Sequence, residues 1–185
     1  MRGDVLGQRG PLDALLAAAK RLEQAPRFHF MFIGGGFVKR QIAEMVRRES
    51  PSNISCMPYQ PLKRVRYSLS AVDIHMVSIG DASVGIIHPC KMYGTMALVK
   101  PVLALGPGAS DLGGIVHESG AGWIHPHGNA EGVVAMLERF VLMPPGDRDA
   151  VAVRAEAFLR ARYSPAALLG QLVDVLEAGT SEGQP

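Results

Sequence analysis

Short apolar runs alternate along the chain with stretches whose apolar residues recur at helical spacing. Each run is too short for a helix, and glycine, proline or polar residues bound it, which is typical of a strand inside a parallel sheet. A sheet of this kind has apolar strands because helices cover both of its faces. We expect five such strands, over residues 28–33, 54–57, 71–77, 101–105 and 121–124.

The intervening stretches predict helices. In the first of them, Leu12, Leu15, Ala19 and Leu22 lie on one face. Proline and glycine mark several boundaries, as at Pro26, which we expect to end the first helix. We expect helices over residues 12–24, 38–48, 62–69, from 89 onward, and over 112–118, 130–141, 148–162 and 165–177.

Strands that alternate with helices in this way predict an α/β fold with a doubly wound, Rossmann-like parallel sheet. We expect a single domain over residues 1–178, a loop over 1–10 and a disordered tail over 179–185. Ligands of such sheets bind outside the carboxyl ends of the strands. The loops of interest are therefore 34–39, 58–61, 78–91 and 105–111.

Composition excludes several classes of protein. The 185 residues are 48% hydrophobic and 19% charged, as in a globular domain, and the net charge of +2 does not favour a nucleic-acid-binding protein. No apolar run approaches the roughly 20 residues of a transmembrane helix. The N-terminus has no apolar signal-peptide core, and Cys56 and Cys90 lack the spacing of a metal site. We expect free thiols in a cytoplasmic protein.

The stretch around Pro89 and Lys91 predicts a phosphate site. Proline suits the first turn of a helix, and we expect a helix to begin at Pro89. Lys91 then lies at the positive end of that helix, where a cation is unfavourable unless an anion shares the site.

A second candidate is the glycine turn over residues 34–36, which follows a strand and precedes Lys39. Glycine lets the backbone approach a bulky anion. The turn is not a Walker A loop, because no Gly-Lys-Ser/Thr follows, and it lacks the full dinucleotide fingerprint. A plain tight turn that packs helix on strand is an equally weighted alternative.

The other reactive side chains carry weaker signals. Cys90 beside His88 suggests a nucleophile pair, but one intervening residue separates them and no arranged base is evident. His125 and His127 lack a third ligand, so we expect no metal site. Asp81, next to the predicted phosphate site, is a candidate to orient a sugar hydroxyl or Lys91; a turn cap is the alternative.

These features, in this order, resemble a known family. The features are the glycine turn 34–36, the strand 72–77, the stretch 89–94 with Met96 and Ala97, the stretch 100–102, and the stretch 118–122. They are similar to the C-terminal, nucleotide-sugar-binding half of retaining glycosyltransferases of family 4 (group 1), which have a GT-B fold. The resemblance covers nearly the whole chain.

The resemblance implies a role for each site. The turn at Gly35 and Gly36, followed by Lys39, would approach the donor, and Tyr59 with Gln60 would hold the nucleotide base. The stretch from Gly85 through His88 and Pro89 to Lys91 would receive the diphosphate and the sugar. These enzymes stabilise the departing diphosphate with amides and basic side chains, so the resemblance implies a UDP- or GDP-sugar donor, hexosyl transfer, no metal and no further cofactor.

Two features depart from the family pattern. The family commonly carries two glutamates around this helix, and Ile86 and Gly94 stand near those positions here. A GT-B enzyme also needs an N-terminal acceptor domain, which the resemblance does not cover, so a partner subunit or acceptor domain is implied. The alternative to a glycosyltransferase is a truncated, non-catalytic remnant that acts as a binding or interaction module. A sugar-nucleotide epimerase ranks last, because no acid/base pair supports it.

Overall fold

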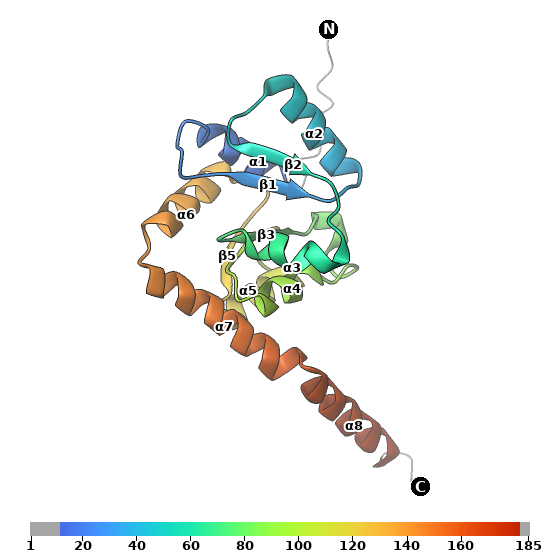
Figure 1. Cartoon of the computed structure of the whole chain (residues 1–185). Coiled ribbons are helices and arrows are strands. Elements are labelled where there is room, and N and C mark those ends of the chain that lie inside the picture. Colours follow the sequence, from blue (N-terminus) through green and yellow to red (C-terminus); the bar gives the residue numbers. More distant parts are fainter. Residues whose placement is uncertain (1–11, 182–185) are drawn as a thin grey trace.

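The computed structural model describes residues 12–181, which form alternating strands and helices (Figure 1). The strands are β1 Phe30–Ile33, β2 Ile54–Met57, β3 His75–Ser78, β4 Val102–Leu105 and β5 Gly122–His125. The helices are α1 Asp13–Arg21, α2 Phe37–Glu49, α3 Leu62–Ser70, α4 Lys91–Ala97, α5 Asp111–Ser119, α6 Ala130–Leu142, α7 Pro145–Tyr163 and α8 Pro165–Ser181, with a 3₁₀ turn η1 at Asp81–Ser83.

All the strand pairs are parallel, which confirms the predicted α/β class. The strands do not form one continuous sheet, however, and this corrects the expectation. β1 pairs with β2, from Phe30 opposite Ile54, and a separate sheet has the order β3-β4-β5. Among the described residues, no backbone hydrogen bond joins β1 to β3. Figure 1 shows the two sheets apart.

Two apolar cores lie on opposite faces of β4. Val102 and Ala104 point into one core, with residues of α4, α5 and α7, while Leu103 and Leu105 point into the other, with residues of α1 and α6. The side chains alternate because successive residues of a strand face opposite sides. Phe30 and Phe32 of β1 pack against the second core, so one helix layer serves both sheets.

Several boundaries differ from those predicted. β3 begins at His75 rather than at residue 71, because residues 72–74 make no ladder pairs in the described structure. Helix α4 begins at Lys91, so Pro89 precedes the helix instead of lying in its first turn. Helix α7 begins at Pro145 rather than at 148, since proline is compatible with the first helical position.

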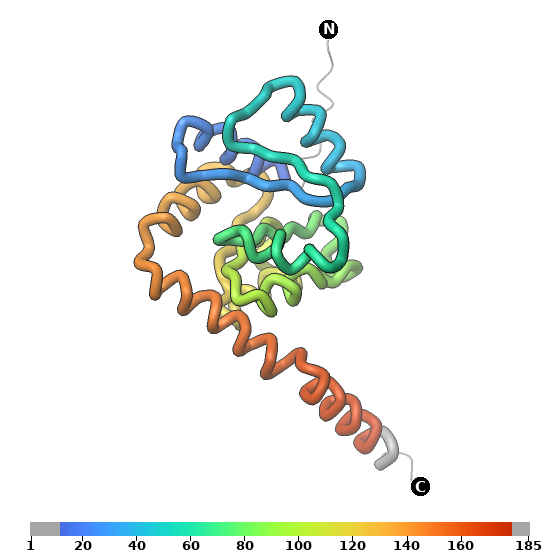
Figure 2. The backbone as a smooth tube through the Cα atoms, viewed as in Figure 1, coloured from blue at the N-terminus to red at the C-terminus, as the bar shows by residue number. Residues whose placement is uncertain are grey.

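The chain ends in two long helices that extend away from the sheets. Figure 2 shows α7 crossing beneath the three-stranded sheet and α8 continuing outward. Helix α8 runs through Ser181, so it includes the first residues of the tail expected over 179–185; residues 182–185 and the loop expected over 1–10 lie outside the described residues. Within the described part of the chain, no helix is long and apolar enough to cross a membrane.

Candidate functional site at the carboxyl ends of the strands

The glycine turn after β1 lies under an aromatic ring from the loop after β2. A Cβ atom added to Gly35 would come within 2.7 Å of Cε2 of Tyr59, so the ring lies directly against this turn. Gly34 and Gly36 have positive φ angles of 119° and 100°, which a side chain rarely tolerates. The local fold therefore requires glycine here, and it brings together Gly35 and Tyr59, which lie far apart in sequence.

The turn leads directly into α2, whose amino end carries no acidic side chain. Gly36 is the N-cap and offers no capping side chain, and Lys39 lies half-buried in the first turn. Phe37, at the first helical position, is exposed, as is Tyr59 with 77% of its surface accessible. Gln60 donates from Nε2 to the carbonyl oxygen of Pro58, 3.0 Å away, which orders its own loop. The turn thus presents unpaired amides, a lysine and two exposed aromatic rings.

Loops that follow β3 and β5 meet through Asp81 and His127. Nε2 of His127 donates to the carbonyl oxygen of Ile79 at 2.8 Å and lies 3.6 Å from Oδ1 of Asp81. The imidazole is mostly buried, whereas the Asp81 carboxylate is exposed. Nδ1 of His127 is buried without a hydrogen-bond partner among the described residues. The contact joins the two loops, and the carboxylate remains open to solvent.

His88, in the loop after β3, contacts residues of two helices, α4 and α5. Its Nε2 shares a hydrogen bond with the Tyr93 hydroxyl of α4, and the two rings stack with centroids 5.4 Å apart. Nδ1 of His88 lies 3.9 Å from Oδ2 of Asp111, the first residue of α5. Burial raises the pKa of Tyr93 above its ordinary value, so the phenol stays protonated at neutral pH. The His88 imidazole thus contacts Tyr93 through one ring nitrogen and lies near Asp111 through the other.

Lys91 is the first residue of α4 and is exposed to solvent. Within residues 12–181 its ammonium group makes no ion pair, whereas Pro89, two residues earlier, is buried. Gly85, also exposed, has a φ of 74° that favours glycine, and it turns the chain between η1 and Pro89. The basic group stands free beside the loop, although the seven-residue helix behind it is short.

The predicted residues therefore form two groups. One, the glycine-turn group, contains Gly35, Gly36, Lys39, Tyr59 and Gln60; the other, the histidine-loop group, contains Asp81, Gly85, His88, Pro89 and Lys91. Both lie in loops after the carboxyl ends of strands or in the helical turns that these loops enter. Among the described residues, no hydrogen bond, ion pair or ring contact links the two groups.

Three residues that contact the histidine-loop group were not predicted as site residues from sequence: Tyr93, Asp111 and His127. The sequence did carry a signal for two of them. The loops that follow β3, β4 and β5 all begin at the same edge of the sheet, because the carboxyl ends of parallel strands share an edge. A polar residue at Asp111 or His127 was therefore a candidate by position alone.

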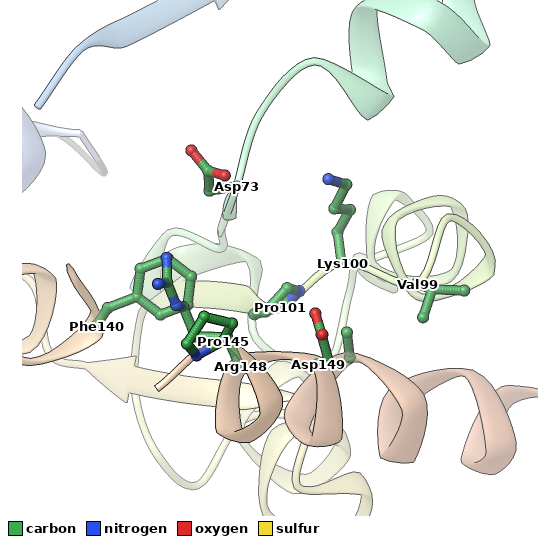
Figure 3. A pocket seen from close by; sticks show the side chains of 9 residues that line it. Asp73, Val99, Lys100, Pro101, Phe140, Pro145, Arg148 and Asp149 are labelled. Carbon is green, nitrogen blue, oxygen red and sulfur yellow. The ribbon is translucent and has the colours of Figure 1, made fainter. Parts of the chain in front are cut away.

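A hollow of about 200 Å³ lies at the opposite, amino-terminal edge of the three-stranded sheet (Figure 3). Lys100 and Arg148 line it together with Asp73 and Asp149, so its charges are mixed. The remaining lining residues are Val99, Pro101, Phe140, Pro145 and Ala152. None of the predicted donor-binding residues contributes to this hollow.

Among residues 12–181, the other titratable groups form neither a metal site nor a disulfide. Within the described part, no three His, Cys, Asp or Glu side chains gather in a way that suits a metal ion, and both cysteines are free. His75 donates from Nε2 to the Leu69 carbonyl oxygen at 2.7 Å. Burial lowers the pKa of His75, and it also lowers the pKa of His125, so the neutral imidazoles are favoured in both.

Comparisons with known proteins place this fold. The chain is 24% identical over 134 residues to the probable glycosyltransferase WbjE of Pseudomonas aeruginosa, a match that covers 71% of this chain and 34% of that protein. The chain thus spans about a third of the length of this curated relative. No family model matches the chain.

Two solved structures share the fold over nearly all of this chain. Sucrose-phosphate synthase from Thermosynechococcus elongatus has a TM-score of 0.66 at 18% identity, over 92% of this chain and 43% of that one. The GtfA/B complex has a TM-score of 0.62 at 12% identity, over 94% of this chain and 34% of that one. The chain is therefore similar in sequence to a glycosyltransferase and has the α/β fold of one half of GT-B glycosyltransferases, as the resemblance implied.

Proposed function

We propose that this chain is the donor-binding half of a glycosyltransferase, which holds a UDP- or GDP-sugar while the sugar is transferred. The observation that carries the proposal is positional. All ten residues predicted for the donor lie in the loops that follow β1, β2 and β3 or in the first turns of the helices that these loops enter, in a fold shared with glycosyltransferases. In open α/β sheets this edge is where ligands bind.

The basic and amide groups would hold the diphosphate. The amino end of α2 offers unpaired amides and Lys39 lies in its first turn, while Lys91, the first residue of α4, makes no ion pair within residues 12–181. Negative charge at a helix amino end is stabilised by the amides and by the helix dipole. The same groups would favour departure of the nucleoside diphosphate, because they stabilise the charge that develops on it.

The exposed aromatic rings favour a nucleotide base. Tyr59 covers the glycine turn with most of its ring accessible, and Phe37 is exposed at the start of α2. Flat apolar rings of this kind stack on bases without discriminating strongly among them. We therefore propose the base site here, with Gln60 in the same loop, and we leave UDP and GDP as equal candidates.

The acidic residues of the histidine-loop group suit a sugar. Asp81 and Asp111 are both exposed carboxylates, and each lies beside an imidazole, His127 and His88 respectively. Carboxylates and imidazoles accept or donate hydrogen bonds to hydroxyl groups. We propose that they orient the hexosyl group, whose acceptor would be a glycan, lipid or protein bound by an acceptor domain or partner subunit. Such a role would belong to polysaccharide biosynthesis in the cytoplasm.

A binding module without catalysis is the second candidate. Ile86, near the position of a family glutamate, is an exposed apolar residue, and Gly94 carries no side chain at the other position. A donor site without these carboxylates would contact the ribose less. Adding an acceptor domain separates the candidates, because sugar transfer or sugar-nucleotide hydrolysis would exclude the non-catalytic module.

Thermal unfolding in the presence of nucleotides tests the donor site. We expect millimolar UDP or GDP to raise the Tm, because a ligand that binds only the folded state stabilises it. Lys91→Ala should abolish the shift. Lys100→Ala is the matched control, since Lys100 lines the hollow at the opposite edge, and it should keep the shift. No stabilisation by either nucleotide would contradict the proposal.

A further inference from the structure

The hollow at the amino-terminal edge of the three-stranded sheet contains a buried donor without an acceptor. Nε of Arg148 is buried, and no group among the described residues accepts a hydrogen bond from it. The guanidinium group lies over the ring of Phe140, with Cζ 5.6 Å from the ring centroid. Buried polar groups in folded proteins almost always have a partner, either in the protein or in a bound molecule. The Nε–H group of Arg148 therefore needs an acceptor that residues 12–181 do not supply.

Four charged side chains line this hollow, two of each sign: Lys100, Arg148, Asp73 and Asp149. Within residues 12–181, none of the four makes an ion pair. Both cations are half-buried, whereas both carboxylates are exposed. A ligand with a single charge would be attracted by two of these side chains and repelled by the other two. A ligand with both signs can face each pair with the opposite charge, so the hollow favours a zwitterion.

These charged groups come from three separate segments that meet at one edge of the sheet. Asp73 and Lys100 lie just before β3 and β4, and Arg148 and Asp149 lie near the amino end of α7 (Figure 3). The amino ends of parallel neighbouring strands share an edge, which brings the first two segments together. The hollow is thus built by tertiary packing rather than by a single loop.

The size and the walls of the hollow limit the ligand. Its volume of about 200 Å³ is smaller than the roughly 300–1,000 Å³ of pockets for drug-sized ligands. A water molecule takes up about 30 Å³ in the liquid, so the space corresponds to roughly seven waters and suits a small metabolite. The other lining residues are apolar, and they leave room for a short apolar group: Val99, Pro101, Phe140, Pro145 and Ala152.

We propose that this hollow binds a small zwitterion of the amino-acid type, in which an acid group and an ammonium group lie a few bonds apart. Arg148 donates from Nε to the acid group, and Lys100 adds a second positive charge. Asp73 and Asp149 accept hydrogen bonds from the ammonium group. A guanidinium group suits a carboxylate because two of its N–H groups can donate in parallel. None of the predicted donor-binding residues lines the hollow, so the inference stands whatever the donor site binds.

An NMR titration of the full chain tests the site directly. The side-chain Nε–H signal of Arg148 is identified by its loss in Arg148→Lys. With millimolar L-valine we expect this signal to shift and saturate, together with the backbone amides of Val99 and Ala152, which line the hollow. Acetate and methylammonium each carry one half of the charge pattern. They should bind at least about tenfold more weakly than L-valine, because each lacks one charged hydrogen bond.

Substitutions separate the two halves of the site. Arg148→Ala should weaken L-valine binding at least about tenfold, whereas Arg154→Ala, in the same helix but outside the hollow, should change it by less than about twofold. Asp149→Asn should weaken L-valine binding but strengthen acetate binding, because it removes a carboxylate that attracts ammonium and repels acid groups. A general loosening of the fold cannot produce effects of opposite sign from one substitution.

Several results would contradict the zwitterion site. No shift with any of the three compounds would mean that water alone satisfies Arg148. Acetate or methylammonium binding as tightly as L-valine would reduce the hollow to a site for one charge. Equal effects of Arg148→Ala and Arg154→Ala would place the binding elsewhere. If Arg148→Ala fails to fold, the titrations of the unsubstituted chain and of Asp149→Asn still decide the question.

Discussion

The three-stranded and two-stranded sheets are built from similar apolar runs, yet they differ in burial. Every residue of β4 is at most 2% exposed, since β3 and β5 flank it and helices cover both faces. Every residue of β1 is only half-buried, although its sequence Phe-Met-Phe-Ile is as apolar as that of β4. The difference shows that neighbours on both edges, rather than hydrophobicity, make a strand fully buried.

The same difference separates the two groups of candidate residues. The histidine-loop group belongs to the three-stranded sheet and is cross-linked by His88 and His127 to neighbouring loops. The glycine-turn group belongs to the two-stranded sheet, where the Tyr59 ring lies against Gly35 and the only side-chain hydrogen bond described for the group, from Gln60 to Pro58, stays within one loop. We therefore expect substitutions near the three-stranded sheet to be more costly.

The largest effect should come from one of two adjacent glycines in α5. A Cβ atom at Gly113 would lie 2.1 Å from the carbonyl oxygen of Gly108, a backbone atom that cannot move without distorting the loop after β4. We expect Gly113→Ala to lower the free energy of unfolding by more than about 3 kcal/mol, which urea titration measures. Gly114→Ala is the matched control.

The control, Gly114→Ala, should raise the free energy of unfolding instead of lowering it. Nothing lies within 4 Å of a Cβ atom at Gly114, so alanine there should stabilise α5 by about 0.5–1 kcal/mol through its helix propensity. Equal effects of the two alanines would contradict the tight packing of this loop. In the two-stranded half, Gly35→Ala meets only the far end of the Tyr59 ring and should cost less than Gly113→Ala.

Methionine truncation compares a fully buried site beside the three-stranded sheet with a half-buried site in the two-stranded sheet, with the chemistry held constant. Met96 of α4 is fully buried, whereas Met31 of β1 is half-buried. We expect Met96→Ala to cost about 3 kcal/mol and Met31→Ala about 1 kcal/mol in urea unfolding, because less apolar surface and a smaller cavity are involved at Met31. Equal costs would contradict the difference in burial between these two methionines.

A serine pair compares a buried helix cap beside the three-stranded sheet with an exposed serine beside the two-stranded sheet. The buried hydroxyl of Ser110 accepts from the Gly113 amide and donates to the Pro107 carbonyl oxygen at 2.6 Å. Ser110→Ala should lower stability by about 1–2 kcal/mol, as loss of an N-cap does. Ser52, near β2, makes only exposed contacts, and Ser52→Ala should change stability by less than about 0.5 kcal/mol. A larger loss of stability from Ser52→Ala than from Ser110→Ala would contradict the expectation that substitutions near the three-stranded sheet are more costly.

The smallest expected effect is a pH dependence of the free energy of unfolding, caused by His75 in the three-stranded sheet. Burial lowers the pKa of His75 below its unfolded value, so the unfolded chain binds the proton more readily. Stability should therefore fall as the pH drops below about 6.5, the ordinary histidine pKa. His75→Gln should flatten this slope between pH 7.5 and 5.5 in chemical unfolding, and an unchanged slope would assign the dependence to other groups, such as His125.

Sequence reasoning located most of the elements because their signals are local. The β2 strand was predicted with its observed boundaries, and α5 and α6 to within one residue, since glycine and capping residues mark their ends. The start of β3 was wrong because residues 71–74 are as apolar as a strand but lack a ladder partner. The predicted start of α7 was wrong because adjacent prolines at 144 and 145 favour a break in sequence, whereas Pro145 occupies the first helical position, which proline tolerates.

The sequence by itself determined the α/β class and the positions of the loops, including the glycine turn at residues 34–36. Those properties depend on residue periodicity and backbone conformation, which are local. Tertiary structure decided that the strands divide into two sheets, that His127 reaches Ile79 and Asp81, and that His88 joins Tyr93 to Asp111. Such contacts depend on which strand edges find partners, and edge pairing joins residues too distant in sequence for any local pattern to encode.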